Sequence, residues 1–167
     1  MAAVLALDFG AHLGWALKRP DGRIESGRKV LGGERVGEKF YRMRLWLHDT
    51  KRRVDLMGGS LVEVIYERVD FAVPGQVYST QAWGGYEAIV TSWCEHHGIE
   101  YRGIAVSTLK KRATGNGFSP KPHVGQAVNK RLATLQPGYR TVTQHDEADA
   151  LALLLFCGGR DAMAHAA

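Results

Sequence analysis

The sequence predicts an α/β fold in which a mixed, five-stranded sheet is flanked by helices. Two observations favour this class. Three strand-like segments near the start of the chain are joined by short turns, which is typical of antiparallel pairs. After them, helical and strand-like segments alternate, which allows parallel crossovers. A sheet that contains both kinds of connection is mixed.

The first three strands are expected to form an antiparallel meander. Residues 4–7 are an apolar run, and a turn over residues 10–14 leads into a second strand over residues 15–18. The tripeptide Pro20-Asp21-Gly22 is a strong turn signal, and a third strand follows near residues 25–31. Gly10 is expected to keep the turn after the first strand narrow.

An amphipathic helix is predicted after the break at Gly32-Gly33. Phe40, Met43 and Leu47 recur at helical spacing, with Tyr41 and Leu45 beside them. The other face of this helix is basic, with Arg42, Arg44, Lys51, Arg52 and Arg53.

The remaining strands alternate with helices. Residues 61–66 are rich in strand formers and predict a fourth strand that ends at Glu67. A long helix over residues 78–97 stops at Gly98, and a fifth strand follows over residues 101–105. The apolar side of the long helix can serve the core or a partner chain, and it carries Trp83, Tyr86, Ile89, Val90 and Trp93.

Three further helices complete the prediction. A short helix contains residues 109–112, a second covers residues 123–135, and the last begins near Gln144. The stretch "ATGNGFSPKP" between the first two has no periodicity and is expected to be a mobile loop.

Composition limits the class of protein. The 167 residues, 45% hydrophobic and 23% charged, suit one soluble domain over residues 1–167, with about the last eight residues as a loose tail. The net charge of +5 favours a polyanionic binding partner. Cys94 and Cys157 form no disulfide framework, which favours buried thiols in a reducing compartment. Without a signal-peptide pattern or a membrane-length apolar run, we expect a cytoplasmic protein with no membrane partner.

Acidic residues stand at the ends of two predicted strands and on the last helix. Asp8 follows the first strand and Glu67 the fourth, and strand ends at one edge of an α/β sheet are where sites gather. In "HDEADALALLL", His145, Asp146 and Asp149 share one helix face. Asp146 has an alternative role in capping the helix, because Thr143 and Asp146, three residues apart, resemble a capping box. A carboxylate at Asp149 is costly unless it is hydrated, paired or bound to a cation.

Four carboxylates of this kind suit hard divalent cations such as Mg²⁺, which prefer oxygen ligands. A two-metal site places its ions roughly 3.5–4 Å apart, so that one activates water and the other stabilises the leaving oxygen. His145 is either a further ligand, a proton shuttle or a surface histidine.

Basic residues bracket the glycine loop shortly before the acidic helix. Lys110, Lys111, Arg112 and Lys121 flank Gly115-Asn116-Gly117. A charge run is usually a solvated face, but this placement is what an enzyme that cuts a polyanion needs. Phosphate contacts of this kind position a substrate without reading its sequence.

With these residues in order, the chain resembles the RuvC family of Holliday-junction resolvases, and most of all the compact versions carried by phages and bacterial genomes. The most specific motifs are "LKKRATGNGFSPK" and "HDEADALAL", and the similarity runs over residues 4–156. The resemblance implies a ribonuclease-H-like fold and a homodimer that resolves four-way DNA junctions in recombination and repair. It also implies phosphodiester hydrolysis with two Mg²⁺ or Mn²⁺ ions per active site.

The resemblance assigns roles to residues of this chain. The family's acidic tetrad maps onto Asp8, Glu67, Asp146 and Asp149, and its two active-site lysines map onto Lys110 and Lys121. Some members use a histidine near the third acid, which corresponds to His145. The residues expected to contact DNA are Lys110, Lys111, Arg112, Asn116, Lys121, Arg68 and Phe71.

This sequence departs from the family's pattern in one region that bears on the substrate. Asp70 stands where cellular resolvases usually carry an aromatic residue that stacks at the junction centre, and Phe71 lies one place later. A nuclease of the same fold acting on flaps or replication forks is therefore an alternative function.

Two other classes fit less well. A DNA-binding module without catalysis gains nothing from clustered carboxylates near phosphates. An actin-like phosphotransferase, which also opens with Asp-x-Gly after a strand, needs a second glycine-rich phosphate loop and normally a second domain.

Overall fold

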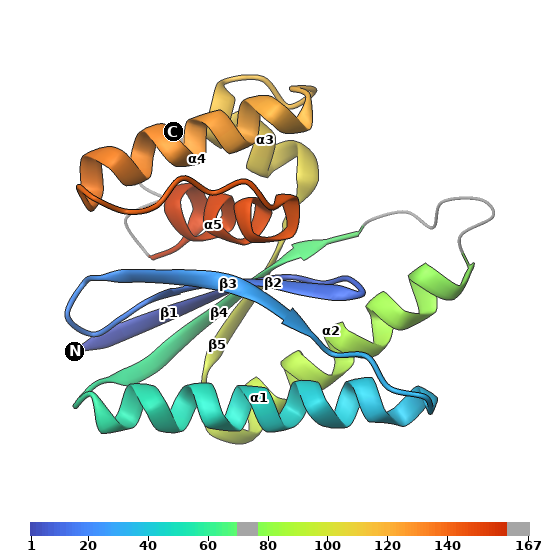
Figure 1. Ribbon diagram of the computed structural model, residues 1–167. Helices are drawn as coiled ribbons and strands as arrows, with labels where there is room; N and C mark the ends of the chain where they lie inside the picture. The colour runs from blue at the N-terminus through green and yellow to red at the C-terminus, as the bar shows by residue number, and fades with distance from the viewer. Residues whose placement is uncertain (70–76, 160–167) are drawn as a thin grey trace.

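The computed structural model of the chain describes residues 1–69 and 77–159 (Figure 1). The expected tail, and the positions of Asp70 and Phe71, lie outside these residues. Within them the protein is an α/β structure with a mixed, five-stranded sheet, which confirms the predicted class. The strand order is β3-β2-β1-β4-β5, so that β1 is the central strand.

The predicted meander and the parallel strands are both present. The strands are β1 (Ala2–Asp8), β2 (His12–Lys18), β3 (Ile24–Val30), β4 (Ser60–Arg68) and β5 (Glu100–Ala105). The first three pair antiparallel, whereas β4 pairs parallel with both β1 and β5. The carboxyl ends of β1 and β4 therefore meet at one edge of the sheet.

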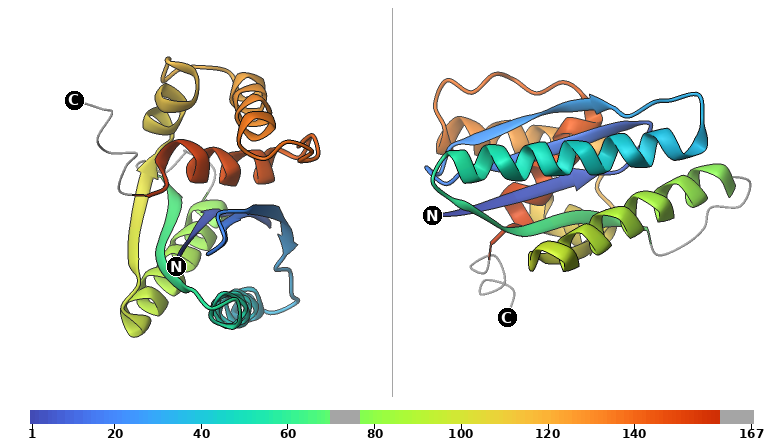
Figure 2. Two further views of the ribbon diagram at one scale, coloured as in Figure 1. Left: turned by 90° about the vertical axis from the view of Figure 1, so that its left-hand side faces the viewer. Right: turned by 90° about the horizontal axis from the view of Figure 1, so that it is seen from below.

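Helices cover both faces of the sheet (Figures 1 and 2). The helices are α1 (Val36–Leu56), α2 (Val77–His97), α3 (Val106–Thr114), α4 (Lys121–Leu135) and α5 (His145–Cys157). Helices α1 and α2 lie on one face and contact each other. On the other face α5 lies against β1 and β2, and α3 and α4 pack on α5.

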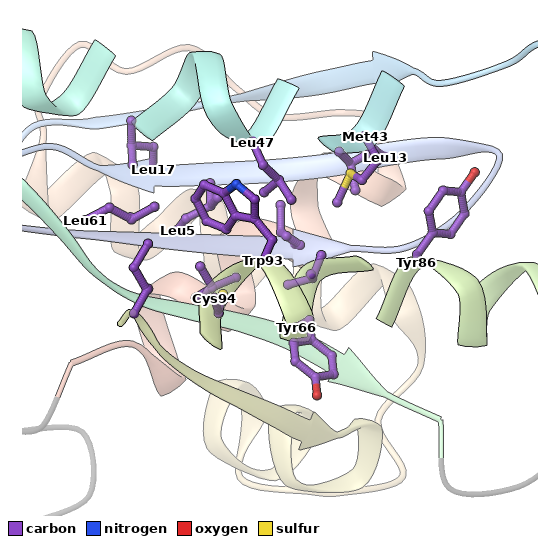
Figure 3. Close-up of a cluster of buried hydrophobic side chains, with 14 of the residues drawn as sticks. Leu5, Leu13, Leu17, Met43, Leu47, Leu61, Tyr66, Tyr86, Trp93 and Cys94 are labelled. Atoms are coloured by element: carbon purple, nitrogen blue, oxygen red, sulfur yellow. The ribbon is translucent and has the colours of Figure 1, made fainter. Parts of the chain in front are cut away.

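Both faces of the central strand are buried, which explains its uninterrupted apolar sequence. Leu5 and Leu7 face the core beneath α1 and α2, and Val4 and Ala6 face the core beneath α5. Figure 3 shows the first of these cores, in which Leu47 of α1 and Trp93 of α2 meet the sheet. Each fully buried leucine contributes about 1.5–3 kcal/mol relative to an exposed one.

The apolar side of α2 serves this core. Tyr86, Val90 and Trp93 are buried, and Trp83 and Ile89 pack against the same cluster. Within the described residues, no helix is both long and apolar enough to cross a membrane.

Two local predictions need correction. Helix α5 begins at His145 with Gln144 as its N-cap, so Thr143 lies before the helix and makes no capping box with Asp146. The glycine loop is shorter than expected, because Thr114 still belongs to α3 and Lys121 already begins α4. The loop is also tied by hydrogen bonds, one of which joins the hydroxyls of Thr114 and Ser119 at 2.6 Å.

Candidate active site

The register of the sheet puts Asp8 and Glu67 at one edge. Leu7 pairs with Tyr66 across the parallel β1–β4 ladder, so the acid that follows each of them occupies the next position on its strand. Both carboxylates are partly exposed. Two distant sequence segments therefore deliver their acids to the same place.

Gly14 lets helix α5 reach this edge. Gly14 pairs with Asp8 across the antiparallel β1–β2 ladder. A Cβ built on Gly14 would overlap the backbone carbonyl of Asp146, so only a glycine fits there. At Gly10, which was expected to keep the turn narrow, a Cβ would meet the backbone of His12 at 3.3 Å.

Asp8, Glu67 and Asp149 respond to the charges of neighbouring acids. Burial raises the pKa of Asp8 from its ordinary value of 3.8 to about 8, and the charges of Glu67, Asp149 and Asp146 add to this effect. Burial and the charge of Asp149 also raise the pKa of Glu67. Burial raises the pKa of Asp149, and Asp146 contributes in the same direction. The structure thus brings the four predicted acids into one electrostatic cluster.

Both predicted lysines face this cluster. The Nζ atom of Lys121, at the start of α4, lies 3.5 Å from Oδ2 of Asp149, and this carboxylate raises the pKa of Lys121. The charges of Lys121 and Lys110 each lower the pKa of Glu67, against the effect of burial. Helices α3 and α4 therefore supply the positive charge of the site.

Arg28 is a further site residue that the sequence analysis missed. Its Nε and Nη2 atoms each lie 3.0 Å from Oδ2 of Asp146, and its Nη1 donates to Oε1 of Gln144 at 3.0 Å. Arg28 pairs with Gly14, which pairs with Asp8, so the three residues form one row across the meander. The lengths of the two turns set the register of β1, β2 and β3, and this register was the signal that could have revealed Arg28.

The other predicted residues take different positions. His145 is exposed at the start of α5, and its charge lowers the pKa of Asp149. Lys111 and Arg68 are exposed. Arg112 is half-buried and hydrogen-bonds to the thiol of Cys157, so its side chain is directed into the α3–α5 contact rather than to the exposed surface.

The donor set fits a hard divalent cation. All four acids offer carboxylate oxygens, and burial, with the charges of neighbouring acids, raises the pKa values of Asp8, Glu67 and Asp149, so that a bound cation would favour their charged forms. Across residues 1–69 and 77–159, no three His, Cys, Asp or Glu side chains are already grouped as ligands of one ion. Arg28 and Lys121 instead contact Asp146 and Asp149.

The architecture is the ribonuclease-H-like fold, with carboxylates at the edge of the central strand. Solved structures of RuvC share it. The RuvC structure from Thermus thermophilus aligns with a TM-score of 0.70 and 18% identity over 92% of this chain and 91% of that chain. RuvC from the same organism, in complex with a Holliday junction substrate, aligns with a TM-score of 0.71 and 19% identity over 92% of this chain and 90% of that chain.

A more distant structure has the same fold. The yeast mitochondrial Holliday junction resolvase Ydc2 aligns with a TM-score of 0.57 and 11% identity over 89% of this chain and 74% of that chain. No protein-family model and no curated protein matches the sequence. At these identities the comparisons establish that the chain has the fold of RuvC.

Proposed function

We propose that this protein is a metal-dependent endonuclease that resolves four-way DNA junctions. The observation that carries the proposal is the convergence of Asp8, Glu67, Asp146 and Asp149 from β1, β4 and α5 of a RuvC fold: the strand register aligns the first two, α5 packs on Gly14 beside Asp8, and the charges of the other three acids raise the pKa of Asp8. Clustered carboxylates oppose DNA binding unless cations neutralise them. The proposal thus explains why a basic protein concentrates acids at one sheet edge.

The four acids would hold Mg²⁺ or Mn²⁺, two ions per site, with His145 as a candidate additional ligand. When bound, the ions would supply an activated water and stabilise the leaving oxygen of the phosphodiester. Lys121 and Lys110 neutralise the acids in the metal-free arrangement. With the cations in place, both ammonium groups can turn to the scissile phosphate and stabilise its developing charge.

We propose that Arg28, like the two lysines, exchanges its carboxylate partner for a DNA phosphate when cations bind. Its guanidinium group holds Asp146 by two contacts of 3.0 Å and is exposed to solvent. Once a cation binds Asp146, the guanidinium can contact a DNA phosphate beside the cut. Lys111, Arg68 and Asn116 are exposed and would extend the phosphate-binding surface.

Paired cuts in a four-way junction need two active sites, so we propose that the protein acts as a homodimer. Helix α2 can contribute to the dimer surface, because Tyr78 is exposed and Trp83 and Ile89 are only half-buried, whereas Tyr86, Val90 and Trp93 are used in the core. We also propose that the chain acts as a single domain in the cytoplasm, which agrees with its two free, buried cysteines.

The test is cleavage of a set of synthetic substrates in Mg²⁺ and in Mn²⁺. The set contains a four-way junction, a flap, a fork and a linear duplex of matched sequence, with Asp146→Asn as the inactive reference. We expect symmetric paired incisions in the junction and no cleavage of the duplex. Preferential cleavage of the flap or fork would favour the broader branched-DNA nuclease. Wild-type cleavage equal to that of Asp146→Asn on all substrates would contradict the proposal.

A further inference from the structure

Phe118 is the most exposed large hydrophobic side chain in the described part of the chain. Its exposed fraction is 93%, although it lies in an ordered turn between α3 and α4 rather than at a chain end. Single exposed apolar residues are common on proteins. A phenylalanine with almost no protein contact, next to a candidate active site, needs a more specific explanation.

The loop fixes the backbone on both sides of Phe118. Gly115 adopts a left-handed φ of 82° and closes α3 by donating to the carbonyl of Lys111 at 2.8 Å. The N–H of Phe118 donates to Oδ1 of Asn116 at 3.0 Å. The next residue, Ser119, is buried and hydrogen-bonded to Thr114. The ring is therefore presented to solvent by a defined backbone.

The surroundings of Phe118 are cationic and close to the acids. Lys110 and Lys111 precede the loop on α3, and Lys121 follows it at the start of α4. Lys121 contacts Asp149 at 3.5 Å. Three residues span about 11 Å at most, which is roughly three nucleotide steps along a DNA strand. The ring thus lies within a few nucleotides of any phosphate held by Lys121.

We propose that Phe118 stacks on an unpaired or unstacked nucleobase of the DNA strand next to the cut phosphate. The inference rests on the proposed function. An aromatic ring flanked by lysines is the combination with which proteins bind exposed bases, since every base offers a π-face and every nucleotide a phosphate. In a continuous duplex the bases stack on each other, so Phe118 favours branch points over duplex.

The test measures DNA affinity in the Asp8→Asn background with Mg²⁺, where the DNA stays intact. Phe118→Ala is expected to weaken binding of a four-way junction about tenfold and to leave binding of a linear duplex unchanged. The dependence of affinity on salt stays the same, because no phosphate contact is lost. Phe118→Trp restores the affinity, since tryptophan also stacks.

Two matched variants separate stacking from other roles. Lys111→Gln is expected to reduce the salt dependence by about one ion on both DNAs, as the loss of a phosphate contact does. Tyr41→Ala removes another exposed aromatic side chain, on α1 and the opposite face of the sheet, and is expected to change neither affinity. The thermal midpoint of Phe118→Ala should equal that of the wild type.

Several outcomes would overturn the inference. The inference fails if Phe118→Ala keeps the wild-type affinity for the junction or loses as much affinity for the duplex. It also fails if Phe118→Trp does not restore the affinity for the junction, or if Phe118→Ala changes the oligomeric state, which would make the ring a protein contact. Junction cleavage by the wild type is measured separately. If the wild type cuts junctions but Phe118→Ala binds like the wild type, only the inference fails. If the wild type cuts nothing, the proposed function fails, whatever Phe118 does to binding.

Discussion

Gly14 is a small residue with a large effect on the candidate site. It sits between Asp8 and Arg28 in one row of the sheet and leaves the space in which the first turn of α5 lies. Because that turn carries Asp146, the missing side chain of Gly14 sets the distance between the strand-end acids and the helix acids.

We predict that Gly14→Ala lowers the free energy of unfolding by about 1–3 kcal/mol or more, as overpacking does. The added methyl group meets the backbone carbonyl of Asp146, which cannot move without α5. Chemical denaturation measures the change. Gly125→Ala on α4 is the control, since a Cβ there meets nothing within 4 Å, and its stability should equal or exceed that of the wild type. Equal stability of the two variants would contradict the close approach.

Asp8 would couple the proposed metal binding to the release of a proton. Its pKa is about 8 in the folded protein and 3.8 ordinarily, so between these values the folded state holds a proton that the unfolded chain has lost. For the metal-free protein, the contribution of Asp8 to stability is therefore greatest below pH 4 and declines as the pH rises to about 8.

We predict that Asp8→Asn removes this decline and that Mg²⁺ binding near pH 7 releases a proton from the wild type but less from the variant. Unfolding curves between pH 4 and 8, and calorimetric titrations in buffers of different ionisation enthalpy, measure the two effects. Identical pH profiles of the wild type and Asp8→Asn would show that Asp8 is not the proton-binding group.

At the scale of elements, a histidine cluster joins α1 to α2. His48 of α1 lies 5.4 Å from His97 of α2 between ring centroids, and Trp93 packs 4.8 Å from His97. Burial lowers the pKa of His97, and the charges of His96, His48 and Lys51 act in the same direction, opposed by Asp55. The contact between the two helices thus favours a neutral His97.

We predict that the stability of the metal-free protein has a contribution from His97 that is present above pH 6.5 and lost as the pH falls below it. The sign follows because the unfolded chain binds the proton more readily than the folded state. His97→Gln should reduce the loss of thermal stability between pH 7.5 and 5.5. His123→Gln, which alters an exposed histidine of α4, should leave the loss unchanged. An equal loss in the wild type and His97→Gln would contradict this role.

Elements with strong local signals were predictable from sequence. The apolar run of β1, the turn at Pro20-Asp21-Gly22 and the helical periodicity of α1 each carry enough information locally. The start of α5 near Gln144 was predicted correctly, but its cap was not, because a threonine and an aspartate three residues apart fit a capping box, although Gln144 takes the N-cap position. Caps depend on where the chain enters the helix, which tertiary packing decides.

At the scale of the whole molecule, the candidate site also contains residues that local patterns predict and residues whose positions depend on tertiary packing. The positions of Asp8 and Glu67 follow from strand ends, and those of Asp146 and Asp149 from helical spacing, so local patterns predicted them. Arg28 and Gly14 depend on the register between strands, which one extra residue in a turn would change. The inward direction of Arg112 depends on how α3 packs on α5, which no local pattern encodes.

The overall architecture gives the proposed metal-dependent site a firm support. The central strand β1 is buried on both faces and paired on both sides, so Asp8 stands at the end of a strand that is packed on every side. Strand β4 brings Glu67 to it, helix α5 brings Asp146 and Asp149, and helices α3 and α4 in the same layer bring the two lysines (Figure 1). Rigid support of this kind is what a catalytic metal site requires.

The central claim is that these carboxylates form one metal-dependent nuclease site. Its most direct test is the single-turnover rate of junction cleavage in Mg²⁺ for the wild type, Glu67→Gln and Asp55→Asn, where Asp55 is an exposed acid of α1 on the opposite face of the sheet. We predict that Glu67→Gln lowers the rate by about three orders of magnitude, because a bound metal supplies several kcal/mol to the transition state. Asp55→Asn should cut at the wild-type rate. Equal rates for Glu67→Gln and the wild type would contradict the account.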